Sequence, residues 1–377
     1  MADHRFGVVI IGAGIIGTSI AYHLARRGRT DVAVLEKESA SGLGSTAKAA
    51  GGIRVQFSSR INVELSRLSI DRFENFEKEM GVTAPFTQAG YLWMASTPEH
   101  LRRFEANAEM QRGFGLTIEL LDRAGVERKA PYVRSDDLLG GVFHGRDGYA
   151  SPADFVRGYE KKARELGVSF FFGEEVTGRQ GRTVRTKTGT FSGEHVVIAA
   201  GAYSGRLGEL FGMEIPVTPV RRQCFVTEPM PEFPHPIPMT IDYGTGVYMH
   251  SESGGLLIGK ADKGEPPGFN ENADYGFLET VAELAMGRVP ALENARIRTG
   301  WGGLYEVTPD NHPLIGAAGE PGWWTACGFS GHGVMHAPAT GMLVAELLET
   351  GRTSLDISCL RLSRFKDGSL NLETNVI

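Results

Sequence analysis

Hydrophobic residues follow two different periods in the first part of this chain. Residues 8–11 form a continuous apolar run, which is typical of a buried parallel strand. After a short glycine-rich segment, apolar residues recur at helical spacing until Gly28, a natural helix stop. A second apolar run at 32–35 ends at Glu36. The pattern predicts strand, turn, helix and strand, and one face of the helix carries Ile16, Ile20, His23 and Leu24.

The same periods predict further elements along the chain. A helical period over about residues 59–80 indicates one long helix, and residues 154–166 indicate another, followed by a strand at 168–172. An apolar strand at 195–199 runs into Ala200 and Gly201, and a last helix covers 334–348. Strands and helices thus alternate in the order expected of an α/β sheet.

The first turn carries the pattern Gly-x-Gly-x-x-Gly between its strand and its helix. Gly12 permits the tight turn, Gly14 allows the backbone to approach a pyrophosphate, and Gly17 lets the helix pack on the strand. The helix N-terminus offers free N–H groups to phosphates. Glu36 follows 24 residues after Gly12 and can accept hydrogen bonds from ribose hydroxyls. The unit therefore predicts an adenine-dinucleotide site.

A second glycine-rich turn lies near the other end of the chain. It consists of residues 328–333, which follow the sequence Thr-Pro-Asp at 308–310 and open the predicted helix at 334–348. A cofactor held by both ends of the chain is long and central to function, which indicates FAD. The N-terminal N–H groups of this helix would stabilise negative charge that develops on the flavin.

The middle of the chain has a different character from its ends. Residues 86–94 and 215–260 contain alternating, β-rich stretches, and prolines at 229–238 mark loops or a sheet edge. We predict an α/β fold in which a Rossmann-like FAD-binding domain carries an inserted α+β substrate domain built on an antiparallel sheet. The expected FAD-binding domain comprises 1–85, 145–212 and 296–377, and the expected substrate domain comprises 86–144 and 213–295.

Composition excludes several other classes of protein. The 377 residues are 41% hydrophobic and include 50 glycines, which suits a globular two-domain enzyme with close contacts between backbone and cofactor. A net charge of −6 gives no attraction to nucleic acid. Three scattered cysteines are too few for a disulfide framework, and we expect no metal site. Residues 6–25 lack charged side chains but read as strand, turn and helix, so we expect a cytoplasmic enzyme without a transmembrane segment.

These motifs resemble a known family over nearly the whole chain. The unit from Gly12 to Glu36, together with residues 44–46, 49–54 and 197–202, is similar to the D-amino-acid oxidase superfamily of FAD enzymes. Residues 308–316 and 328–333 resemble its sarcosine oxidase branch, which includes beta subunits of heteromeric sarcosine oxidases and proline dehydrogenases, and dimethylglycine dehydrogenases. The resemblance implies oxidation of the C–N bond of a small amine or N-alkyl amino acid by hydride transfer to flavin N5, giving an imine that hydrolyses.

The motifs and the resemblance together name the candidate site residues. Those for the cofactor are Gly12, Gly14, Ile15, Ile16, Gly17, Glu36, Lys37, Ser45, Thr46, Ala50, Gly51, Gly52, Val176, Ala200, Gly201, Gly303, Gly328, Gly331, His332, Gly333, Val334 and Met335. Those for catalysis are Arg54, Tyr248, His250 and His332.

Each catalytic candidate has an alternative interpretation. Arg54 is expected to pair with a substrate carboxylate, although it could instead lie at the surface or face the pyrophosphate. Tyr248 and His250 share one face of a strand, and Val247 and Met249 line the pocket if the other face covers the flavin. For His332 we expect a structural role with its backbone as donor, and a direct acid–base role is the alternative.

The resemblance also predicts how the flavin is held. Some relatives attach FAD through a histidine where this chain has Lys48, and monomeric sarcosine oxidases attach it through a cysteine where this chain has residues 303–305. Cys327 is expected to be a buried small hydrophobe. The sequence therefore predicts a non-covalent flavin.

The electron acceptor and the substrate stay open at this stage. Monomeric sarcosine oxidases have a lysine where this chain has Met335. They use another lysine for the reaction with oxygen, and the corresponding position here is Leu257 or, after a register slip, Lys260. The acceptor is oxygen, a quinone or a partner protein, with a dehydrogenase favoured, and the branch leaves a heteromeric partner subunit open. The alternative functions are a 2-hydroxy-acid dehydrogenase and a non-catalytic flavoprotein subunit or assembly factor.

Overall fold

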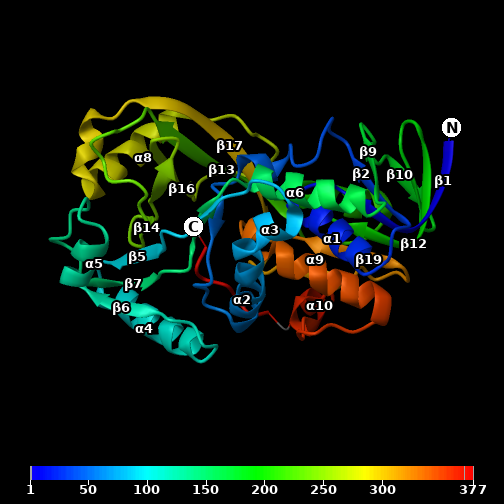
Figure 1. The fold of residues 1–377 in the computed structure, drawn as a ribbon, viewed down its shortest axis with the longest axis horizontal. Coiled ribbons are helices and arrows are strands. Elements are labelled where there is room, and N and C mark those ends of the chain that lie inside the picture. Colours follow the sequence, from blue (N-terminus) through cyan, green and yellow to red (C-terminus); the bar gives the residue numbers. More distant parts are fainter. Residues whose placement is uncertain (1, 369, 377) are drawn as a thin grey trace.

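Two large sheets of different construction lie side by side in the computed structural model, which describes residues 2–368 and 370–376 (Figure 1). The first sheet has the strand order β10-β11-β12-β1-β2-β9, and β19 pairs with β12 and with β18. The pairs β1–β12, β1–β2, β2–β9 and β12–β19 are parallel. Its strands are β1 (Ala2–Ile11), β2 (Val32–Glu36), β9 (Ser169–Phe172), β10 (Gly178–Gln180), β11 (Thr183–Arg185), β12 (Gly189–Ile198), β18 (Leu314–Ala317) and β19 (Trp323–Cys327).

Three helices pack together beside the first sheet. The helix α1 (Ile15–Arg26) contacts both α6 (Pro152–Glu165) and α9 (Gly333–Thr350), as Figure 1 also shows. Ser19 donates a hydrogen bond to the carbonyl oxygen of Ala337 over 2.8 Å. A side chain at Gly341 would overlap the Ser19 hydroxyl, so glycine allows the close approach of α9 to α1. The two ends of the chain are thereby joined at the helix that follows the first glycine turn.

The second sheet is largely antiparallel, with the order β17-β13-β16-β15-β14-β5-β7-β6 and one parallel pair, β14–β5. Its strands are β5 (Tyr91–Ala95), β6 (Glu119–Asp122), β7 (Gly140–His144), β13 (Thr218–Thr227), β14 (Met239–Asp242), β15 (Tyr248–Glu252), β16 (Gly255–Lys260) and β17 (Ile297–Val307). The predicted boundary at residue 296 assigned β17 to the FAD-binding domain. In the structure this strand belongs to the second sheet. The reason is its long pairing with β13, from Thr218 opposite Val307 to Thr227 opposite Ile297.

The helix expected over residues 59–80 is interrupted, which corrects that prediction. The structure has α2 (Arg60–Glu74) and α3 (Phe76–Met80), separated at Asn75. The Asn75 amide donates to the backbone carbonyl of Asp71 over 2.7 Å, and such local side-chain bonds compete with a continuous helix. Phe73 and Phe76 are nevertheless both buried, so the apolar period that suggested one helix survives the break.

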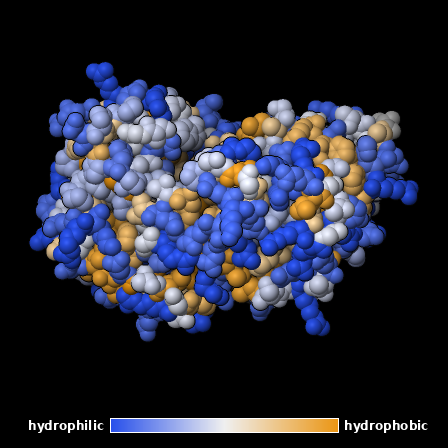
Figure 2. Space-filling model, viewed as in Figure 1, coloured by the Kyte–Doolittle hydropathy of each residue, from blue (hydrophilic) through white to orange (hydrophobic). Residues whose placement is uncertain are grey.

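The remaining elements are short or peripheral. The helices α4 (Pro98–Arg112), α5 (Arg123–Lys129) and α8 (Tyr275–Arg288) pack at the second sheet. A small sheet is formed by β3 (Gly52–Ile53), β4 (Phe86–Thr87) and β8 (Gly148–Ala150), and the other helices are α7 (Ser204–Phe211), α10 (Arg364–Asp367), η1 (Ser45–Lys48), η2 (Gly201–Tyr203), η3 (Pro290–Asn294) and η4 (Ser358–Leu360). Figure 2 shows a face on which hydrophilic residues predominate and apolar ones are scattered. Within 2–368 and 370–376, we find no helix with the length and apolar character needed to cross a bilayer.

Candidate functional site

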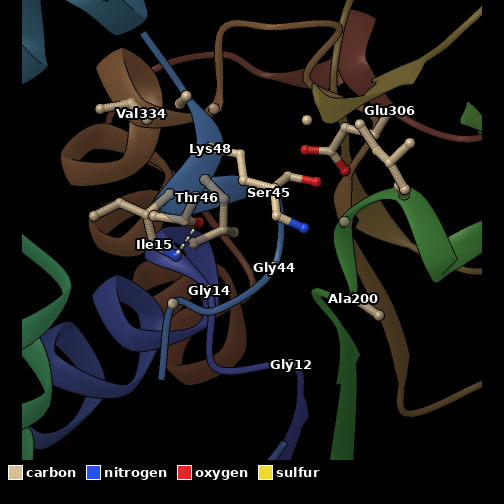
Figure 3. Close-up of a pocket in the computed structure, with 18 of the residues that line it drawn as sticks. Gly12, Gly14, Ile15, Gly44, Ser45, Thr46, Lys48, Ala200, Glu306 and Val334 are labelled. Carbon is tan, nitrogen blue, oxygen red and sulfur yellow. Dashed lines mark hydrogen bonds between the residues drawn. The ribbon is translucent and has the colours of Figure 1, made fainter. Parts of the chain in front are cut away.

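A cavity of about 590 Å³ lies between the two sheets and receives residues from distant parts of the chain (Figure 3). One side is formed by the turn before α1, the segment from Leu43 to Arg54, and the turn after β12. The other side is formed by β13, β15 and β17 of the second sheet and by the N-terminus of α9. The volume falls in the range of pockets that enclose a large ligand.

The first glycine turn is built by steric necessity. Gly12 has φ +108°, in the region that favours glycine, and a side chain there would collide with the backbone of Ala199. A side chain at Gly17 would overlap the carbonyl oxygen of Gly12. Gly17 does not line the cavity; it lets α1 start directly against the turn, as its place in the motif predicts.

Two side chains fix the backbone at the start of α1. The Thr46 hydroxyl accepts a hydrogen bond from the amide of Ile15 over 3.2 Å, drawn as a dashed line in Figure 3. Glu36 accepts from the amide of Ala13 over 2.8 Å with one oxygen and from the amide of Glu38 over 3.0 Å with the other. A carboxylate has about four acceptor sites, so Glu36 keeps capacity for further donors such as ribose hydroxyls.

This end of the cavity fits the adenosine and pyrophosphate of FAD. Besides Glu36, its wall includes Val176 and Lys37, whose ammonium lies 3.7 Å from the ring centre of Tyr203. The turn at Gly12 and Gly14 has no side chains that could fill the space in front of α1. Amide groups at a helix N-terminus, an acceptor for ribose and an apolar patch are the groups that such a nucleotide requires.

Most of the cofactor candidates line this one cavity. They are Gly12, Gly14, Ile15, Ile16, Glu36, Lys37, Ser45, Thr46, Ala50, Gly51, Gly52, Val176, Ala200, Gly201, Gly303, Gly331, His332, Gly333, Val334 and Met335. Gly328 lies outside the lining. It contacts a lining residue, because its amide donates a hydrogen bond to the Glu306 carboxyl over 2.8 Å.

The predicted pocket face of β15 divides between its two candidates. Tyr248 lines the cavity, whereas His250 does not. The His250 ring stacks on Tyr149 at 4.2 Å and makes a hydrogen bond of 2.9 Å with the carbonyl oxygen of Ala50. His250 therefore supports the wall from behind, since the segment around Ala50 stands between its ring and the cavity. A catalytic role for His250 does not fit this position.

Arg54 reaches the cavity as a buried cation. Its side chain is 2% exposed, and its guanidinium donates to the backbone carbonyls of Gln56 and Asn375. The guanidinium lies 4.0 Å from the ring centre of Phe57 and 5.2 Å from that of Trp93. Among the described residues, no carboxylate forms an ion pair with it. Burial lowers the pKa of Arg54, while more distant carboxylates and tyrosines oppose that shift. A substrate carboxylate would supply the missing counter-charge.

Sequence reasoning missed the aromatic wall opposite Arg54. Tyr91 and Tyr305 line the cavity beside Tyr248, and the Tyr248 hydroxyl lies 3.5 Å from the Cys224 sulfur. Burial raises the pKa of the Cys224 thiol to about 11, so the thiol stays protonated at neutral pH. Tyr305 stands two residues after Gly303 on β17, and strand alternation from that candidate was the signal that could have identified it.

Glu306 is a second residue that sequence reasoning did not select. It lies at the edge of the cavity (Figure 3) and accepts from the amide of Gly328 over 2.8 Å. Burial raises the pKa of its carboxyl to about 7, against an ordinary value of 4.5. The protonated acid can donate a hydrogen bond to an oxygen in the cavity, which a carboxylate could not do.

His332 closes the cavity at the start of α9. Its ring is 3% exposed and meets the ring of Phe57 edge to face at 4.9 Å. Burial, aided by the positive charge of Arg54, holds the pKa of His332 well below its usual range, so the imidazole is neutral. The residues that follow, Gly333 to Met335, present the free N–H groups of the first helical turn at the cavity wall.

The residues connected with flavin attachment and oxygen lie in different places. Lys48 lines the cavity next to Gly303 and forms an ion pair of 2.7 Å with Glu271. Cys327 is fully buried in an apolar cluster and does not line the cavity, and neither do Leu257 and Lys260. The Lys260 ammonium donates to the carbonyl oxygen of Thr245. In the part of the chain that the structure describes, we find no group of three or more side chains arranged to hold a metal ion.

The chain is similar to known FAD-dependent proteins over nearly its whole length. The model of the DAO family, described as FAD dependent oxidoreductase, matches residues 7–347. The beta subunit of sarcosine oxidase from Rhizobium meliloti is 30% identical, over 97% of this chain and 90% of that protein. The crystal structure of L-proline dehydrogenase from P. horikoshii superposes with a TM-score of 0.92 at 32% identity, over 98% of this chain and 100% of the other.

A further relative is longer than this chain. Mitochondrial dimethylglycine dehydrogenase from Rattus norvegicus is 30% identical over 96% of this chain, but the match covers 45% of that protein. The chain thus spans about half the length of this relative.

Proposed function

The chain belongs to the DAO family of FAD-dependent oxidoreductases, which act on amines and amino acids, and from that premise we propose that it oxidises a small N-alkyl amino acid. Arg54 carries the proposal. A buried guanidinium whose hydrogen bonds go to backbone carbonyls, at the wall of a cofactor cavity, is suited to hold the carboxylate of such a substrate.

The roles of the residues follow from their positions. Bound FAD would accept a hydride from the substrate carbon that bears the nitrogen. Arg54 orients the substrate by its carboxylate, and the buried Tyr248 and half-buried Tyr305 help to enclose it and exclude water. The first turn of α9 directs its N–H groups at the cavity, where negative charge develops during the reaction. His332 is neutral and buried, so we assign it to positioning and not to proton transfer.

We further propose that the flavin is bound without a covalent link. Lys48 is an ammonium paired with Glu271, and Gly303 has no side chain. Among the described residues, Cys224 is the one cysteine in the cavity lining, and its raised pKa disfavours a reactive thiolate. Acid precipitation of the purified protein should release intact FAD into the supernatant. Flavin that stays in the pellet would overturn this part of the proposal.

The substrate class is tested by anaerobic reduction of the purified flavoprotein. N-methylglycine, proline, N-methylglutamate, simple secondary amines and 2-hydroxy acids are mixed with the oxidised enzyme, and loss of flavin absorbance is followed. We expect bleaching by N-alkyl amino acids in preference to neutral amines of similar size. Bleaching by 2-hydroxy acids alone would show that the protein is a 2-hydroxy-acid dehydrogenase and not an amine oxidoreductase. Bleaching by none of these compounds would contradict the proposal.

For the electron acceptor we propose a quinone or a partner protein rather than oxygen. A cation near the flavin stabilises the superoxide-like state that forms when oxygen is reduced. Lys260 does not line the cavity, and the charge of Lys48 is offset by Glu271. Stopped-flow mixing of the reduced enzyme with oxygen should therefore show slow reoxidation.

A further inference from the structure

A second arginine at the substrate end of the cavity has no assigned role. Arg222 lies on β13, opposite Gly303 of β17, and lines the cavity together with Cys224. Its neighbours along the strand, Arg221 and Gln223, are not in the lining, as the alternation of a strand requires. The side chain of Arg222 therefore faces the same space as Tyr248 and Arg54.

The adjacent arginine shows what a structural arginine looks like here. Arg221 donates twice to the carboxylate of Glu265, over 3.0 and 2.7 Å, and once to the carbonyl oxygen of Asn272 over 2.7 Å. Its side chain is 10% exposed and that of Glu265 is 5% exposed. The positive charge of Arg221 is thus paired, and its guanidinium donates hydrogen bonds to acceptors inside the protein.

Arg222 lacks any such partner among the described residues. Its one hydrogen bond runs from Nη1 to the carbonyl oxygen of Arg221, over 3.0 Å. Its Nε atom is buried without an acceptor, and its guanidinium lies 5.2 Å from the ring centre of Tyr305. A buried donor without an acceptor costs free energy, which an anionic ligand in the cavity would recover.

Among the described residues, no carboxylate of the cavity lining forms an ion pair with Arg222. Glu36, Glu38, Glu174 and Glu175 line the nucleotide end, and Glu271 is paired with Lys48. Glu306 is largely protonated below pH 7, because burial raises its pKa to about 7. Arg54 and Arg222 both act on Tyr305, each tending to lower its pKa against the effect of burial. The guanidinium charges of Arg54 and Arg222 thus both act on this phenol, and among the described residues neither forms an ion pair with a carboxylate.

From this arrangement we infer that the substrate is dianionic: an N-alkyl amino acid with a second carboxylate on its side chain, the first held by Arg54 and the second by Arg222. This inference rests on the proposed function and specifies its substrate class. With FAD bound, the cofactor would supply the oxidation: the carbon–hydrogen bond beside nitrogen would break, its two electrons and one proton would leave as hydride, and the nitrogen would lose a proton to solvent. Water then hydrolyses the resulting imine. Arg222 takes part in recognition and not in these steps.

The first test measures binding without turnover. The oxidised holoenzyme is titrated with glutarate and with its monoamide, which differ in one negative charge, and the change in flavin absorbance is followed. We expect glutarate to bind roughly 10- to 100-fold more tightly, the range of one charge-assisted hydrogen bond. Equal binding of the two compounds would overturn the inference, whatever the enzyme oxidises.

The second test compares substrates and variants. Wild-type enzyme should prefer N-methylglutamate to N-methylglutamine by roughly 10- to 100-fold in kcat/KM, in whichever enantiomer is oxidised. Arg222→Gln should remove that preference by lowering kcat/KM for N-methylglutamate, while kcat/KM for N-methylglutamine changes less than about twofold. Arg222→Lys should keep part of it. Lys260→Gln is the matched control, because it removes a positive charge from the same sheet outside the cavity.

The outcomes separate the inference from the proposed function. If N-methylglycine or proline reduces the flavin but charged and amide substrates are equal, the substrate class proposed here is wrong and amine oxidation stands. If Arg222→Gln slows both substrates alike and shifts the flavin reduction potential, the arginine serves the cofactor and the inference fails. If no amine reduces the flavin but glutarate binds through Arg222, the anion site stands and the proposed reaction fails.

Discussion

The two ends of the cavity differ in what forms their surface. At the nucleotide end, the surface consists mainly of backbone, and glycines keep it free of side chains. At the substrate end, the surface consists of large side chains, above all Arg54, Arg222 and the tyrosines Tyr91, Tyr248 and Tyr305. A backbone surface gives a fixed shape for one invariant cofactor, whereas side chains provide charge and size that can change one residue at a time.

This difference implies two kinds of response to mutation. An added methyl group at Gly12 or Gly17 meets backbone atoms that cannot move aside, so its effect is a loss of binding that is independent of substrate. A change at the substrate end removes one interaction, so its effect depends on which group of the substrate made it. The following predictions test this contrast.

The largest effect is expected for Gly17→Ala. The new methyl group would overlap the carbonyl oxygen of Gly12, so α1 could not start against the turn. We expect protein that retains no FAD after desalting, as measured by absorbance at the flavin band. Gly287→Ala in α8 is the control, because no atom lies within 4 Å of its added carbon, and it should retain full occupancy. Normal FAD content in Gly17→Ala would show that the backbone surface is not rigid.

Arg54→Gln should have the next largest effect, confined to substrates with a carboxylate. Loss of a charge-assisted pair in a shielded site should cost about 2–4 kcal/mol in kcat/KM. A neutral amine should be nearly unaffected, and FAD content should stay unchanged. Steady-state kinetics with both substrates measure this. An equal loss for both would mean that Arg54 supports the flavin or the fold, since it also binds the carbonyls of Gln56 and Asn375.

Glu306→Gln should change how the stability of the apoprotein depends on pH. The pKa of Glu306 is raised to about 7 in the folded state, so its contribution is fully present below the ordinary value of 4.5 and is lost as pH rises through about 7. Because the carboxyl is partly exposed to the cavity, we expect a loss of at most about 3 kcal/mol in the free energy of unfolding. Urea unfolding at pH 5 and pH 8 should show a smaller loss in Glu306→Gln. The exposed control Glu279→Gln should behave as wild type, and an unchanged slope in Glu306→Gln would contradict the assignment.

The smallest effect is expected for Lys260→Met. Since Lys260 binds the carbonyl of Thr245 and does not line the cavity, the rate of flavin reoxidation by oxygen should change less than about twofold. Stopped-flow absorbance after anaerobic reduction measures that rate. A tenfold decrease would place the ammonium beside the flavin and would assign the oxygen reaction to the second sheet.

Several residues that the sequence grouped at the first glycine turn line one cavity, because local rules determine their positions. Gly12, Gly14, Glu36 and Thr46 lie within 35 residues of one another, and their spacing alone places them around one turn. Arg222 was not selected because its position depends on the pairing of β13 with β17, whose register no local pattern reveals. Tyr305 was within reach of the sequence, by strand alternation from Gly303. His250 was misplaced for the same reason: alternation gave its face but not the segment around Ala50 that covers it.

The joining of the two chain ends also has a consequence for biosynthesis. Residues 12 to 54 leave the ribosome early, but the segments 303–306 and 331–335 that complete the cavity follow some 250 residues later. At about 5–20 residues per second, the nascent chain spends on the order of 10–50 s with an incomplete site. The complete cavity for FAD therefore forms only after the second half of the chain has been made. The supply of FAD should affect the yield of this protein after synthesis, through the lifetime of the finished apoprotein, and not during elongation.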